Sequence, residues 1–104
     1  MEGNNIETLK REAEQCTKDM FLYSQFVNEQ KILLFVEDEN VLEEQKKLIL
    51  HLWEEMEILN ACVLSDWEDD NQPDEYTLKW GESYQEDAKK LIKQVTDVLN
   101  SICK

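Results

Sequence analysis

Few side chains in this sequence have the types and spacing that catalysis requires. His51 is the single histidine, and it stands between Leu50 and Leu52 in an apolar-rich stretch. A catalytic base needs a nucleophile or a carboxylate positioned beside it. Glu54 and Glu55 follow at spacings that meet on a helix, but a histidine–glutamate contact of this kind is an ordinary surface pair. We therefore expect no catalytic residue and no enzyme activity.

The thiols and carboxylates also lack the spacing of a metal or cofactor site. Cys16, Cys62 and Cys103 form no CxxC pair, and their number is odd. The sequence contains neither the Glu-x-x-His motifs of di-metal bundles nor a glycine-rich phosphate loop. We expect no metal and no cofactor, and we expect reduced, buried thiols as in an intracellular protein. Cys103, near the end of the chain, could face solvent and form an intermolecular bridge.

The most distinctive local feature is an acidic stretch over residues 66–75, which holds six acids, a tryptophan and no base. Such runs between helices are usually solvated loops. The functional alternative is a docking element, in which acids around an aromatic anchor steer a basic partner towards it. Residues 65–69 loosely resemble the tryptophan-acidic peptides that cargo adaptors present to kinesin light chains, with Ser65 where a Leu or Met commonly stands. The candidate docking residues of this acidic segment are Asp66, Trp67, Glu68, Asp69 and Asp70.

The overall charge restricts the classes of partner. The chain has 24 acids and 11 bases, which gives a net charge of −13 at pH 7. Nucleic acids and anionic membranes bind clustered cations, so we expect neither as a direct ligand. The charge suits a basic protein partner, or it serves solubility alone. It also allows an acidic inhibitor that mimics nucleic acid, although the lysines interrupt the acids that such a mimic would need.

Three stretches of apolar residues at three- and four-residue steps predict the helices that carry these side chains. They cover residues 5–36, 40–67 and 74–103. In the central stretch, Asn40 and Glu43 have the spacing of a capping box, so we expect Asn40 to cap this helix. Two glycines and one proline offer little turn chemistry for strands.

Short breaks between these stretches favour antiparallel neighbours. We predict an all-α fold, an antiparallel three-helix bundle with long coiled-coil-like helices, in a single domain over residues 1–104. This resembles spectrin-type three-helix repeats in size and helix count. A break in the first helix near residues 24–28 would give four shorter helices instead. Residues 32–36 could alternatively form a short buried strand.

The first predicted helix carries more apolar residues than one packing face needs. In the central stretch, Trp53 belongs to a second stripe, which lies beside the apolar face expected to pack against the other helices. Exposed apolar surface of this kind often forms an interface. The candidate apolar binding residues are Phe21, Phe26, Ile32, Phe35, Val36 and Trp53.

Together these features favour a non-enzymatic helical adaptor or assembly subunit. It would bind a helical or basic protein partner, or a second copy of itself, through apolar helix faces. The alternative is the acidic mimic of nucleic acid. No apolar run has the length of a membrane span, and the first residues lack the pattern of a signal peptide. We therefore expect an intracellular protein, cytoplasmic or nuclear, without a membrane partner.

Overall fold

The computed structural model describes residues 2–102, and every described element is helical. The prediction of an all-α class is therefore confirmed. The prediction about Cys103 lies outside the described residues. In chain order the elements are α1 (Glu2–Cys16), α2 (Met20–Glu29), the 3-10 helix η1 (Lys31–Val36), α3 (Glu43–Asp69), α4 (Thr77–Ser83) and α5 (Gln85–Ile102).

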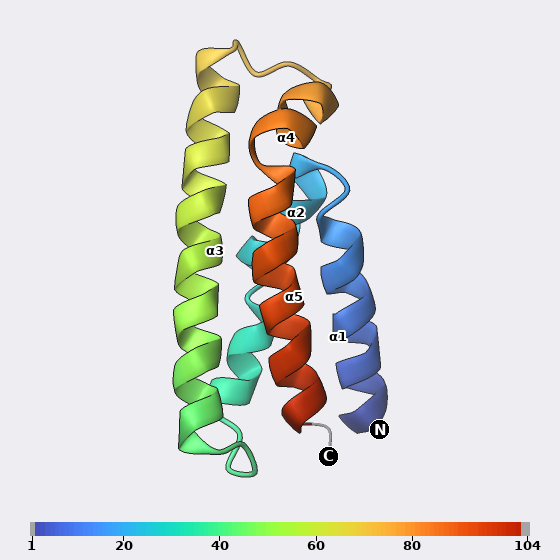
Figure 1. Cartoon of the computed structure of the whole chain (residues 1–104), viewed down its shortest axis with the longest axis vertical. Helices are drawn as coiled ribbons and strands as arrows, with labels where there is room; N and C mark the ends of the chain where they lie inside the picture. Colours follow the sequence, from blue (N-terminus) through green and yellow to red (C-terminus); the bar gives the residue numbers. More distant parts are fainter. Residues whose placement is uncertain (1, 103–104) are drawn as a thin grey trace.

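These elements form an elongated helical bundle of 45 × 22 × 20 Å (Figure 1). The chain runs along the long axis four times: α1 in one direction, α2 with η1 back, α3 over the full length, and α4 with α5 back (Figure 1). α1 packs against α2 and α5, while α3 packs against α2, η1 and α5. The bundle therefore has four antiparallel legs, the number given by the alternative of a broken first helix, rather than the three of the main prediction.

The single first helix predicted over residues 5–36 is wrong, and so is the suggested break near residues 24–28. The helix ends at Cys16 and a new one begins at Met20. Asp19 makes this restart favourable, because its carboxylate accepts a hydrogen bond from the Leu22 backbone N–H at 2.9 Å and so caps α2.

The return leg breaks once more, at Gln30. This residue has a positive φ of 56°, a left-handed conformation that ends α2 and turns the chain into η1. Because η1 covers residues 31–36 as a 3-10 helix, the alternative of a short strand over residues 32–36 is also wrong.

α3 begins three residues later than predicted. Asn40 does not cap it, because it lies two residues before the N-cap position, in a turn where its backbone N–H donates to the Asp38 carboxylate at 2.9 Å. The cap position is held by Leu42, whose backbone N–H donates to the Gln45 side-chain oxygen at 3.1 Å. The last predicted helix is likewise divided, with Tyr84 separating α4 from α5.

The core lies along the bundle axis, and its largest members are aromatic. Trp80 and Tyr23 are both 0% exposed, with ring centroids 5.4 Å apart. Both polar atoms are satisfied: the Trp80 indole N–H donates to the Thr17 carbonyl at 2.9 Å, and the Tyr23 hydroxyl donates to the Met56 carbonyl at 3.0 Å. These bonds tie α4 to the α1–α2 turn and α2 to the middle of α3.

No helix within residues 2–102 is long and apolar enough to cross a membrane.

Candidate functional site

The six residues of the predicted apolar surface do not share one face. Phe26 and Ile32 are 6% and 3% exposed, so the chain's own helices cover them. Three more are only half-buried and pack against the core: Phe35, Val36 and Trp53. Only Phe21 counts as exposed, at 42%. Much of the apolar surplus seen in the sequence is therefore used inside the bundle, because the break after Cys16 adds a fourth leg that must be packed.

Phe21 meets Trp67 at the end of the bundle where α2 begins and α3 ends (Figure 1). Their ring centroids lie 5.7 Å apart and their planes cross at 86°, an edge-to-face contact. The Trp67 indole N–H donates to the Pro73 carbonyl at 2.8 Å, which fixes the ring beside the loop that follows α3. The structure thus brings together one residue from the predicted apolar set and one from the predicted acidic set.

The predicted acidic residues around this pair divide into two groups. Asp66 and Asp70 are used internally, since they accept hydrogen bonds from the Tyr84 and Tyr76 hydroxyls, the second at 2.7 Å. These bonds hold the last turn of α3 to the chain around α4. The other carboxylates, which are exposed as Asp70 also is, form no ion pair within residues 2–102, and they comprise Glu68, Asp69, Asp74 and Glu75.

A hollow of about 210 Å³ adjoins Phe21 at the same end. It lies between the start of α2 and the loop before α4, and its lining includes Asp19, Asp74 and Glu75 as well as the Phe21 ring. Carboxylates and an aromatic ring can together hold the cationic head of a lysine or arginine. We call this surface the acidic end and define it as Phe21, Trp67, Glu68, Asp69, Asp74 and Glu75.

Three tyrosines, Tyr23, Tyr76 and Tyr84, make the stability of the folded chain sensitive to alkaline pH. Burial, followed by the hydrogen bond to Asp66, raises the pKa of Tyr84 to about 12. Burial likewise raises the pKa of Tyr76, helped by its bond to Asp70, and the pKa of Tyr23. The folded state therefore holds these protons more tightly than the unfolded state does.

We expect the melting temperature to fall steeply as the pH rises from about 10, the ordinary tyrosine pKa, to about 12. Below that range the full stabilisation is present, because the tyrosines are protonated in both states. Thermal melts followed by circular dichroism measure this decline, and Tyr84→Phe should make it shallower. A melting temperature that stays constant through this window would contradict the assignment.

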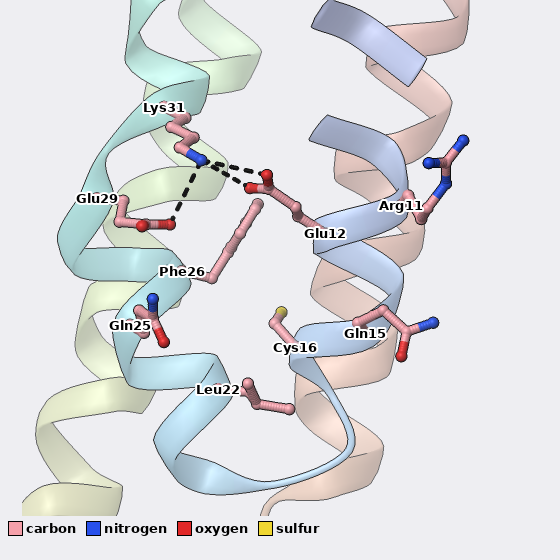
Figure 2. Close-up of a pocket in the computed structure, with 9 residues that line it drawn as sticks. All are labelled: Arg11, Glu12, Gln15, Cys16, Leu22, Gln25, Phe26, Glu29 and Lys31. Carbon is pink, nitrogen blue, oxygen red and sulfur yellow. Dashed lines mark hydrogen bonds and ion pairs between the residues drawn. The ribbon is translucent and has the colours of Figure 1, made fainter. Parts of the chain in front are cut away.

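A second concave surface lies between α1 and α2 (Figure 2). Its volume is about 320 Å³, and Cys16, Leu22 and Phe26 give it an apolar lining. One end is crossed by Lys31, whose ammonium bonds to both Glu12 carboxylate oxygens at 3.2 and 2.9 Å. The bond to Glu12 raises the pKa of Lys31, so this bridge stays charged. Lys31 pairs with Glu12 and Glu29, and Arg11 is the other charged residue of the lining. Because the lining holds two acids and two bases, this groove favours neither sign of ligand.

The two described cysteines differ in exposure, which predicts different reactivity. Cys16 is buried, and desolvation raises the pKa of its thiol to about 12, whereas Cys62 is exposed. At about pH 8 the Cys16 thiol is therefore almost entirely protonated, and the thiolate is the reactive form. In a Cys103→Ser chain, iodoacetamide should therefore modify Cys62 alone until denaturant is added. Peptide mass spectrometry measures this, and equal modification of Cys16 in the native protein would contradict it.

His51 is 66% exposed at its side chain and lies 3.7 Å from Glu55, in the surface pair that the sequence predicts. Within residues 2–102 no three His, Cys, Asp or Glu side chains converge as a metal site would require.

Comparison of the chain with protein-family models, curated proteins and solved structures finds no match.

Proposed function

We propose that this chain is a non-enzymatic adaptor or assembly subunit that binds a protein partner at its acidic end. The proposal rests on one observation, the Phe21–Trp67 pair, with Phe21 42% exposed, among four carboxylates that have no partner within residues 2–102. Aromatic residues surrounded by polar groups are the usual anchors of protein interfaces. Charges around them mainly raise the association rate and select the partner.

The partner that this surface suits is a basic segment with an apolar or aromatic residue among its lysines or arginines. The apolar residue packs against the Phe21 ring, and the cations lie near Glu68, Asp69 and Asp74. A second copy of the chain is a poorer occupant, because two acidic ends brought together repel each other. We therefore place the binding on a different protein rather than on a self-assembled oligomer.

Selection from a displayed library of random peptides on the purified chain tests this proposal. The selected peptides should be rich in Lys and Arg, should contain a recurring apolar or aromatic position, and should keep part of their affinity at about 0.5 M salt, where exposed charges are screened. Peptides without basic residues would contradict the proposal. Affinity that is lost entirely in salt, together with displacement of the selected peptides by nucleic-acid-binding proteins, would favour the mimic of nucleic acid instead.

A further inference from the structure

A third concave surface runs between α3 and α5, on a different side of α3 from the acidic end. Its volume is about 370 Å³. Trp67 contacts Phe21 on α2, whereas this groove opens beside α5, so the two surfaces do not overlap. The lining of the groove is Glu55, Ile58, Leu59, Cys62, Asp87, Lys90, Leu91 and Gln94.

The apolar part of this groove has the form of a helix-binding site. Ile58 is 61% exposed, and Leu59 and Leu91 lie half-buried on facing helices. Cys62 continues this apolar surface by one helical turn beyond Ile58, and the exposed His51–Glu55 pair bounds it on the side towards the start of α3. On α3 the lining runs from Glu55 to Cys62, a length of about 10 Å or about two helical turns.

The charges around the groove favour a basic occupant. Residues 48–65 of α3, which flank the groove, contain three acids, Glu54, Glu55 and Glu57, and no Lys or Arg. Within the groove, Glu55 stands on the α3 side and Asp87 on the α5 side, with Lys90 as the single cation of the lining. A second copy of this acidic chain would bring like charges together.

We propose that the α3–α5 groove binds a basic amphipathic helix of a partner protein, with the apolar stripe of that helix on Ile58, Leu59 and Leu91. Lysine or arginine residues flanking the stripe lie against Glu55 and Asp87. This is the helix-in-groove mode, in which apolar anchors at three- and four-residue steps enter a hydrophobic groove. An acidic end and a separate groove would let one small protein join two partners.

A synthetic peptide of leucine and lysine, about 18 residues long with the leucines on one helical face, serves as the probe. Its affinity is measured by fluorescence anisotropy on the full-length Phe21→Ser chain, in which the acidic end has lost its exposed apolar anchor and does not compete with the groove for the peptide. The controls are a peptide of the same composition with the leucines distributed around the helix, and a peptide in which glutamate replaces lysine. We expect the amphipathic basic peptide to bind most tightly, and equal binding by either control would overturn the proposal.

Matched variants locate the binding on the chain. Ile58→Asn should weaken binding about tenfold, because it removes an apolar contact of the groove. Leu78→Asn, at a residue 76% exposed on α4, should leave it unchanged. Both asparagine variants replace exposed side chains, so folding is retained. An unchanged affinity in Ile58→Asn, or an equal loss in Leu78→Asn, would contradict the assignment.

Cys62 provides a measurement that needs no substitution in the groove. In the Cys103→Ser chain, saturating amphipathic peptide should slow alkylation of Cys62 at least fivefold, since the bound helix covers the exposed thiol. An unchanged rate under saturation would place the peptide elsewhere and overturn the proposal. This result is independent of the acidic end, so failure here and failure of the proposed function can be told apart.

Discussion

Replacing Trp80 with alanine is expected to lower the free energy of unfolding by about 3–5 kcal/mol, because a large buried side chain leaves a cavity that its neighbours only partly fill. Trp80 is 0% exposed and lies against Tyr23 and Tyr84, with ring centroids 5.4 and 6.4 Å away. The change also removes the indole N–H that bonds to the Thr17 carbonyl in the α1–α2 turn. A domain of this size has a total stability of about 5–15 kcal/mol, so the variant approaches unfolding.

Urea denaturation followed by circular dichroism measures this loss without relying on tryptophan fluorescence. Trp80→Phe should cost less, because the ring partly fills the site and the Thr17 carbonyl keeps its bond from the Gln85 side-chain amide at 3.0 Å. Leu78→Ala on the same short helix is the matched control, and we expect a change within about 0.5 kcal/mol, since its side chain is 76% exposed. If Trp80→Ala lowers the free energy of unfolding by less than about 1 kcal/mol, Trp80 does not have the central place in the core that we assign to it.

Replacing Phe21 with serine is expected to weaken binding of the partner at the acidic end by about 30-fold, the effect of losing an interface anchor worth about 2 kcal/mol. The substitution removes the exposed ring and its edge-to-face contact with Trp67. Association should remain sensitive to salt, because Glu68 and Asp69 are unchanged and still steer the basic partner.

The control for this prediction is Leu34→Ser, which removes a side chain 70% exposed on η1, towards the opposite end of the bundle (Figure 1). Phe21→Leu keeps an apolar contact and should retain more affinity than serine. Isothermal calorimetry with a selected basic peptide gives the affinities, and a urea titration shows that each variant remains folded. Equal affinity in Phe21→Ser and Leu34→Ser would mean that Phe21 is not an anchor.

The helical class and much of the core follow from the apolar spacing, but the first break does not. Along the first 27 residues the apolar residues keep their three- and four-residue spacing across the break. All the residues with this spacing are buried in the structure: Ile6, Leu9, Ala13, Cys16, Met20, Tyr23 and Val27. The spacing is the same for one long helix and for two helices that fold back on each other, because both legs turn that stripe towards one core. The hydrogen bonds that fix the break join Asp19 to Leu22, and the Thr17 carbonyl to side chains more than sixty residues away.

The acidic end could be predicted only in part, for a related reason. The acids and Trp67 are evident as a local run, but Phe21 lies 46 residues earlier, and no local pattern indicates that the two rings meet. Likewise, Asp66 and Asp70 have the same residue type as the exposed Asp69. Their hydrogen bonds depend on where the loop after α3 places the Tyr76 hydroxyl and on where the break between α4 and α5 places the Tyr84 hydroxyl.

The most direct test of the proposed function is the nitrogen–proton NMR spectrum of the chain, free and saturated with a selected basic peptide. We predict that the largest shifts fall on Phe21, Glu68, Asp69 and the indole N–H of Trp67, which donates to the Pro73 carbonyl in the free chain. The η1 residues should keep their positions. Shifts concentrated on η1 and the start of α3, with the Trp67 indole unmoved, would contradict the acidic end as the binding surface.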